Sequence, residues 1–185
     1  ILLAAGIKKI CWSFDPLMAG NAHFNLVTLG ALPVEYIVDM YGDTSSELHQ
    51  GLDTDRLIIE WCLTEPAVER ALAGDPRYLP DAARTGPVIP THQTGADATA
   101  LPRAPWVRLE IPADVEHLKA TAPELAREWQ FSFRRAFTAY LNEGQGRVIG
   151  ICRDEATERY CYAVDTTAGM ALPPSDDTPR SNGAR

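Results

Sequence analysis

The sequence lacks the features that define several large classes of protein. No apolar run approaches the ~20 residues that a membrane-spanning helix needs, so we expect no membrane partner. Four cysteines without a C-x-x-C pair are too few for a disulfide scaffold, which predicts free thiols and a cytoplasmic location. The chain has 17 basic and 25 acidic residues, and its net charge of −8 disfavours nucleic acid as a partner.

Motifs that bind phosphates or metals are missing as well. The chain contains neither G-x-x-x-x-G-K-[ST] nor G-x-G-x-x-G, and it has no G-x-S-x-G nucleophile turn. Its four histidines are scattered without partners at ligand spacing, so we expect no metal site. A group of carboxylates is better explained as a solvated loop leading into a strand than as a catalytic pair: Asp43, Glu47, Asp53, Asp55 and Glu60.

What is present is an ordinary globular pattern, with 45% hydrophobic residues in periodic segments. Helices are predicted at 17–29 and at 123–142, the second with a capping box formed by Thr121 and Glu124. A short helix is predicted between them, with Thr64 as its N-cap and Gly74 just after its end. Strands are predicted at 8–14, 33–41, 56–63, 106–111, 147–152 and 159–164, the last two as a hairpin. Within 33–41 the alternation puts four residues on one face: Val34, Tyr36, Val38 and Met40. The fold class is therefore α/β, of the mixed α+β kind.

Composition divides the chain into four parts. Residues 1–72 form one unit, and residues 106–165 form a strand, helix and hairpin that extend the same domain. Residues 73–105 hold six of the 14 prolines and are either an ordered surface excursion or a flexible linker. Residues 166–185 are polar, and we expect a disordered tail there. Because residues 1–6 read as the last turn of a helix ended by Gly6, without an initiator Met, we expect the chain to be a fragment.

Three runs in the first unit carry a family resemblance. They are W-S-F-D-P-L at 12–17, N-A-H-F-N-L at 21–26 and L-G-A at 29–31, followed by Y-G at 41–42, T-D-R-L at 54–57 and E-W at 60–61. These runs resemble the GNAT superfamily of acyl-CoA N-acyltransferases, and more closely a bacterial branch of predicted acetyltransferases. The resemblance covers residues 1–72 and extends to 106–165.

The resemblance implies the C-terminal part of a GNAT fold, a mixed twisted sheet with flanking helices, followed by a strand-helix-hairpin addition. In that fold two neighbouring parallel strands splay apart, and the pantetheine arm of acetyl-CoA or another acyl-CoA pairs with the exposed backbone. The strand that ends at Phe14 would be one of them, with Asp15 opening the sheet. Asn21 and Asn25, four apart on the next helix, would bind the pantetheine or the thioester.

These four residues also have structural explanations. Phe14 is an aromatic residue on a strand face and is expected in the core rather than against a ligand. Asp15 fits a turn that accepts backbone N–H groups equally well. The two asparagines are slightly unfavourable inside a helix, which favours a functional reason for them.

Two departures from the family pattern concern the cofactor and the proton donor. The pyrophosphate-binding loop, Q/R-x-x-G-x-G/A, occurs nowhere in the chain; we expect it just upstream of Ile1, and without it weak acyl-CoA binding and no activity. The tyrosine that many members use to protonate the leaving thiolate is replaced by Leu26. Water, His23 or another group would have to supply that proton, so the catalytic residue stays unidentified.

Arg56 and Glu60 alternate onto one strand face, where they form either a structural ion pair or a substrate-binding pair. Arg56 would suit a carboxylate on an amino-acid-like acceptor. The expected function is acyl transfer, acetyl or succinyl, from acyl-CoA to a small-molecule amine. The alternative is a GNAT-like binding module without catalysis. The oligomeric state is not predicted.

Overall fold

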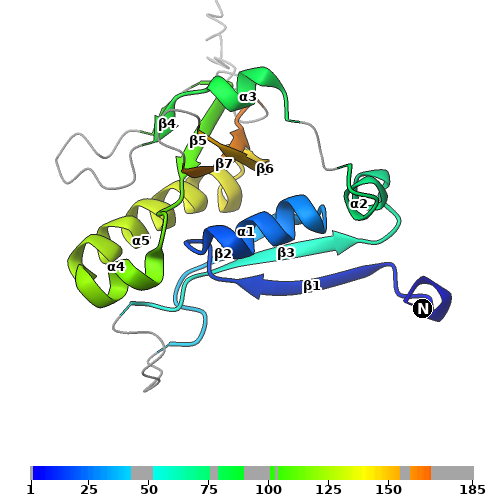
Figure 1. Cartoon of the computed structure of the whole chain (residues 1–185), viewed down its shortest axis with the longest axis horizontal. Helices are drawn as coiled ribbons and strands as arrows, with labels where there is room; N and C mark the ends of the chain where they lie inside the picture. Colours follow the sequence, from blue (N-terminus) through cyan, green and yellow to red (C-terminus); the bar gives the residue numbers. More distant parts are fainter. Residues whose placement is uncertain are drawn as a thin grey trace, which may run out of the picture.

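The computed structural model describes residues 2–42, 52–75, 79–89, 101–102, 104–154 and 159–167. Within them the chain has the predicted mixed α+β class (Figure 1), but its strands form two separate sheets rather than the one mixed sheet that the resemblance implies. The strands are β1 (Lys9–Phe14), β2 (Leu32–Ile37), β3 (Arg56–Cys62), β4 (Val88–Ile89), β5 (Trp106–Glu110), β6 (Arg147–Arg153) and β7 (Tyr160–Asp165). The α-helices are α1 (Ala19–His23), α2 (Pro66–Leu72), α3 (Asp81–Thr85), α4 (Val115–Thr121) and α5 (Pro123–Phe137).

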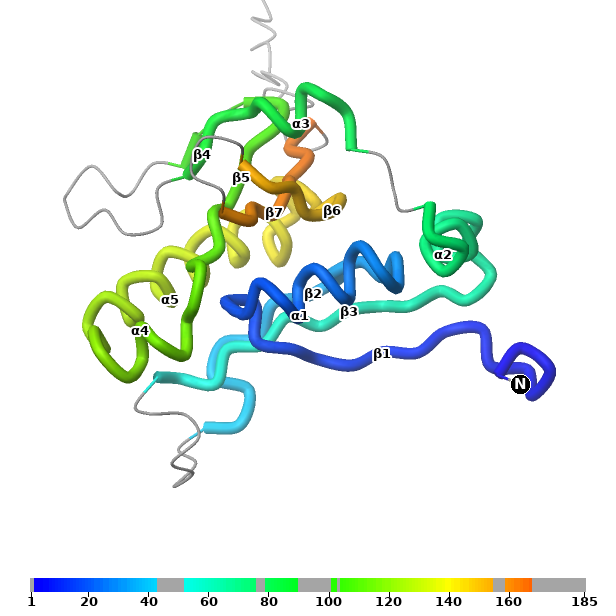
Figure 2. The backbone as a smooth tube through the Cα atoms, in the orientation of Figure 1, coloured from blue at the N-terminus to red at the C-terminus, as the bar shows by residue number. Residues whose placement is uncertain are grey.

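The first sheet is antiparallel, in the order β1-β3-β2, so the strand that comes last in sequence lies in the middle. Figure 2 shows the chain leaving β1, returning as α1 along one face of this sheet, and entering β2. The second sheet has the order β4-β5-β7-β6, in which only the β4–β5 pair is parallel. The predicted hairpin is confirmed as β6 and β7.

The strand predicted at 33–41 is shorter than expected. The prediction that Val34, Tyr36, Val38 and Met40 share one face is wrong. A β-bulge lies between Pro33 and Glu35, and it turns Val34 outward to 46% exposure while Tyr36 is buried at 2%. The strand ends at Ile37, because Asp39 has a φ of 45° and starts a turn. An extra residue in one strand shifts every following side chain to the other face.

Two predicted helix caps are also wrong. Glu65, not Thr64, precedes the first residue of α2, and its side chain makes no capping bond. Thr121 is the last residue of α4, a helix that the sequence analysis missed, and its hydroxyl donates to the carbonyl of His117 at 2.7 Å. Glu124 instead pairs with Arg127 at 2.7 Å, so no capping box forms.

The predicted helix at 17–29 forms later and in two parts. Asp15 Oδ1 accepts the backbone N–H of Leu17 at 2.9 Å, which holds residues 15–17 in a turn before α1 begins at Ala19. The helix then widens into a π-helical segment, Phe24–Thr28, and ends before Gly30 at a φ of 66°. α5 likewise continues as the π-helical segment Thr138–Asn142, which completes the predicted helix.

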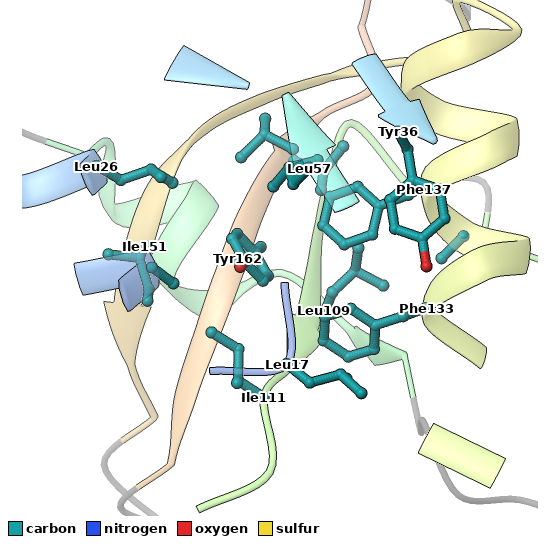
Figure 3. Packing of buried hydrophobic residues seen from close by; sticks show 14 of the residues in the cluster. Leu17, Leu26, Tyr36, Leu57, Leu109, Ile111, Phe133, Phe137, Ile151 and Tyr162 are labelled. Atoms are coloured by element: carbon teal, nitrogen blue, oxygen red, sulfur yellow. The ribbon is translucent and has the colours of Figure 1, made fainter. Parts of the chain in front are cut away.

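One hydrophobic cluster joins the two sheets through α5. Tyr36 stacks on Phe137 with ring centroids 5.2 Å apart, and Phe133 and Phe137 both contact the edge-on ring of Tyr162 (Figure 3). Leu57 from β3 and Leu109 from β5 are fully buried in the same cluster. Residues 1–72 and 106–165 therefore share one core.

A smaller cluster covers the other face of the second sheet and includes two cysteines. Ala83 of α3 and Leu79 pack there against Cys152 and Cys161, which oppose each other on β6 and β7. The described parts of 73–105 thus contribute a helix, a short strand and buried side chains.

The four cysteines are predicted to differ sharply in reactivity. Burial raises the pKa of the Cys161 thiol to about 12 and also raises that of Cys152, whereas Cys11 is exposed. At pH 8 the thiolate fraction of Cys161 is then about a thousandfold below that of an ordinary thiol. We expect iodoacetamide to alkylate Cys11 rapidly and Cys161 hardly at all, as measured by peptide mass spectrometry. In urea all four should react alike; equal rates in the folded protein would contradict this packing.

Candidate functional site

The outer edge of β1 is the first feature of the candidate site. β1 is an edge strand whose partner among the described residues is β3 alone. The N–H of Leu63 donates to the carbonyl of Lys8 at 2.8 Å, which fixes the alternation of the β1–β3 ladder. The backbone groups of Ile10, Trp12 and Phe14 therefore face β3, and those of Lys9, Cys11 and Ser13 face outward. The site thus offers alternate donors and acceptors along one open edge.

Phe14 and Asp15 lie where this edge ends. Phe14 is 5% exposed and belongs to the core, as its structural interpretation predicts. Asp15 accepts from the N–H of Leu17 through one oxygen, and Lys119 Nζ lies 3.4 Å from the other. Asp15 thus stabilises the turn that directs the chain away from β1.

Asn25 is buried and its side chain is used within the fold. Its Oδ1 accepts from the indole N–H of Trp12 at 3.1 Å, and its Nδ2 donates to the carbonyl of Asn21 at 2.9 Å. Asn21 itself is exposed, with its amide 3.5 Å from the sulfur of Met18. The structure therefore brings the two asparagines together, but it leaves only Asn21 open to solvent.

Substituting Asn25 tests whether its side chain stabilises the fold or serves only to bind a ligand. In Asn25→Leu the half-buried Trp12 indole loses its acceptor, and we expect a loss of about 1 kcal/mol of folding free energy, the lower end of the range for a donor left without a partner. We expect urea denaturation to show that loss. Asn21→Leu is the matched control and should leave stability within about 0.5 kcal/mol, because the residue is on the surface. Equal stability of the two variants would contradict a structural role for Asn25.

The residue at position 26 cannot protonate a leaving thiolate as the family's tyrosine does. Leu26 is 2% exposed and packs in the core. His23 is partly buried with its ring against Tyr160, at 5.8 Å between centroids. His23 therefore lies against β7.

Arg56 and Glu60 do not form the predicted structural ion pair. Glu60 binds Lys9 Nζ at 2.7 Å and accepts from the thiol of Cys62 at 3.3 Å. The hydrogen bond from Lys9 lowers the pKa of Glu60, and the same bond raises the pKa of Lys9. The two residues are four positions apart along an extended strand, about 13 Å, so each finds a nearer partner.

Arg56 keeps its guanidinium free of carboxylates within the described residues. The group lies over the ring of Tyr41 at 5.4 Å, and its Nε is buried without a hydrogen-bond acceptor. It lines a cavity of about 20 Å³ together with Asp15 and Lys119. That volume suits one water molecule, so any substrate group would meet the outer edge of the guanidinium.

Asp55 was predicted on a solvated loop but instead lies at the centre of a buried polar network. Asp55 is 4% exposed and accepts two bonds from Arg134, at 2.8 and 3.0 Å, and one from the hydroxyl of Tyr36 at 2.6 Å. Burial, and then the charge of Asp55, raise the pKa of Tyr36, and the hydrogen bonds to Asp55 raise that of Arg134. Asn142 bonds both backbone groups of Tyr36, at 2.9 and 2.7 Å, and so replaces a strand beside β2.

This network fixes α5 to the first sheet and so positions the end of β3 that carries Arg56. Asp55 and Arg134 are 79 residues apart, and no local spacing indicates their pairing. The only signal is the T-D-R-L run at 54–57, where the aspartate stands beside the arginine predicted as functional.

Within the described ranges, no three histidine, cysteine, aspartate or glutamate residues are placed to hold a metal ion. Of the helices that the structure describes, none is long and apolar enough to span a membrane.

Comparisons of the chain with protein-family models, with curated proteins and with solved structures find no match.

Proposed function

We propose that the chain takes part in N-acyl transfer, moving an acetyl or similar acyl group from acyl-CoA to a small-molecule amine in the manner of GNAT enzymes. The observation that carries the proposal is the open edge of β1, which ends at Asp15 and Pro16 and is followed at once by α1. The sequence runs that resemble the family lie on these same elements. Acyl-CoA is a co-substrate here, and no metal is required.

The edge provides what a pantetheine arm needs. The arm contains two amides, and the outward N–H and C=O groups of Cys11 and Ser13 are spaced to bond such amides as a neighbouring strand would. An arm held this way keeps the thioester fixed beside the sheet, so the amine attacks an oriented carbonyl. Backbone N–H groups aimed at that carbonyl oxygen would stabilise the negative charge that develops there.

The reaction balances without a further cofactor. The amine nitrogen forms a bond to the carbonyl carbon, the carbon–sulfur bond breaks, and the thiolate leaves with a proton while the nitrogen loses one. The amine approaches from the face of the sheet that carries Arg56, which is opposite to α1. Arg56 there favours an acceptor with a carboxylate, such as an amino acid. Succinyl-CoA remains an alternative donor to acetyl-CoA.

A second function is favoured by one observation. The family's tyrosine position holds the buried Leu26, which has no hydroxyl to protonate a thiolate. The side chain of the neighbouring Asn25 is already bonded to Trp12. This fits a module that binds acyl-CoA or a partner without catalysis. In a protein that also carries the pyrophosphate-binding loop, release of free CoA thiol from acetyl-CoA or succinyl-CoA, in the presence of a panel of amino acids, separates the two functions. Binding without any thiol release would favour the module.

The edge is tested by proline, which removes a backbone N–H. Proline is tolerated on an edge strand where its N–H would face outward, so Cys11→Pro should keep the fold. We expect its affinity for acetyl-CoA or S-acetylpantetheine to fall about tenfold, the effect of one lost hydrogen bond. NMR titration at millimolar ligand measures this even when binding is weak.

Cys11→Ala is the matched control, since it removes the thiol and keeps the N–H. Equal affinities of Cys11→Pro and Cys11→Ala would overturn the proposal. Ser13→Pro removes the next outward donor and serves if Cys11→Pro loses the fold, which circular dichroism shows.

A further inference from the structure

A cavity on the outer side of α5 contains none of the residues proposed to bind acyl-CoA or its amine acceptor. It has a volume of about 600 Å³ and lies between the C-terminal half of α5, its π-helical continuation and the segment Leu101–Pro102. Small-molecule sites have volumes of about 300–1,000 Å³. The cavity is therefore large enough for a ligand of the size of a substituted aromatic ring.

Arg135 is the charged residue of this cavity for which the described part of the chain provides no partner. Its Nε is buried and has no hydrogen-bond acceptor, and the guanidinium forms no ion pair with any residue that the structure describes. The preceding Arg134 also lines the cavity but is bonded to Asp53 and Asp55. Buried polar groups in folded proteins are nearly always bonded, so the buried, unbonded Nε of an arginine that lines a cavity points to an acceptor supplied by a ligand.

The other lining groups match an anion with an attached ring. Phe131 is 56% exposed, and the guanidinium of Arg134 lies over one face of its ring at 5.5 Å, so its other face is the one that a ligand ring can cover. Burial raises the pKa of Tyr140 to about 12, so its hydroxyl is neutral, and it donates to the carbonyl of Pro102 at 3.2 Å. The cavity's single carboxylate among the lining residues, Glu143, accepts from Gln145 at 3.0 Å. Arg134 is paired with Asp53 and Asp55, so among the charged lining residues Arg135 is the one cation that no described carboxylate neutralises.

We propose that this cavity binds a small aromatic oxyanion, a carboxylate or phosphate ester on a flat ring. The anionic group bonds the fork of Arg135, which matches the two oxygens of such a group. The ring covers Phe131 and excludes water from that bond. The proposal does not depend on acyl transfer, because the residues that line the cavity include none of those on β1 or β3.

Phenyl phosphate is the probe, with phenol and inorganic phosphate as its two halves. We expect the full probe to bind more tightly than either half, in NMR titrations that follow the amide signals of α5. Arg135→Met keeps the alkyl stem and removes the guanidinium, and it should weaken phenyl phosphate roughly tenfold to a hundredfold. Phenol binding should not change.

Arg127→Met is the matched control, because Arg127 is on the same helix outside the cavity and pairs with Glu124. It should leave the affinity for phenyl phosphate unchanged. The probe-free stability of Arg135→Met should equal or exceed that of the parent, since the variant no longer buries an unbonded donor. Phenyl phosphate that fails to bind at millimolar concentration, or that binds the two variants equally, would overturn the proposal. Tighter binding of inorganic phosphate than of phenyl phosphate would contradict the part assigned to Phe131.

Discussion

Replacing Asp55 with alanine is expected to destabilise the fold by about 3 kcal/mol or more, the usual result of breaking a buried ion pair from one side. The carboxylate accepts from Arg134, from the Tyr36 hydroxyl and from the backbone N–H of Asp39 at 2.9 Å. In Asp55→Ala the hydroxyl stays buried without an acceptor, and the guanidinium keeps only Asp53. Urea denaturation followed by circular dichroism measures the loss.

Asp53→Ala is the matched control for this experiment. Asp53 contacts the same guanidinium at 2.7 Å, but its side chain is 48% exposed. Exposed ion pairs contribute about 0–1 kcal/mol, so this variant should stay close to the parent. If Asp55→Ala and Asp53→Ala had equal effects, the network would be a surface feature rather than the link between α5 and the first sheet.

Replacing Phe137 with alanine is expected to cost about 3–5 kcal/mol, which is the range for a fully buried aromatic side chain. Its ring stacks on Tyr36 and meets the edge of Tyr162, so it joins α5 to both sheets at once. The cavity left by the ring is bordered by two sheets and a helix, which cannot all move inward to fill it. The free energy of unfolding in urea is again the measurement.

Phe131→Ala is the control on the same helix. Phe131 is 56% exposed, and its removal should change stability by no more than about 0.5 kcal/mol. A small effect of Phe137→Ala would contradict the single core shared by residues 1–72 and 106–165.

The parts of the fold that could be predicted are those with a clear period. β1, β3 and β5 follow from alternation, the β6–β7 hairpin follows from two short apolar runs joined by polar residues, and an apolar stripe from Leu125 to Leu141 predicts α5. The errors in the predicted elements come from features that the hydrophobic period does not indicate. The bulge at Val34 reverses the faces of β2. Thr121, predicted to cap the start of a helix, is instead the last residue of α4.

The candidate site was predictable only where its residues are neighbours in sequence. The turn at Asp15 and the contact between Asn21 and Asn25 follow from local spacing. The long-range partners of Asn25, Glu60 and Asp55 do not follow from local spacing. These partners are Trp12, Lys9 and Arg134, which reach their positions through the sheet order and the docking of α5. Arg56 and Glu60 were likewise predicted as a pair because they are close in sequence, whereas the geometry of an extended strand separates them.

The central claim is that the open edge of β1 holds the pantetheine arm of acyl-CoA, and amide NMR tests it most directly. We expect S-acetylpantetheine to shift the amide protons of Cys11 and Ser13 downfield and to slow their exchange with solvent. Those of Ile10 and Trp12, which already bond β3, should change far less. Shifts that do not alternate along β1, or that leave Cys11 and Ser13 unchanged, would contradict the claim.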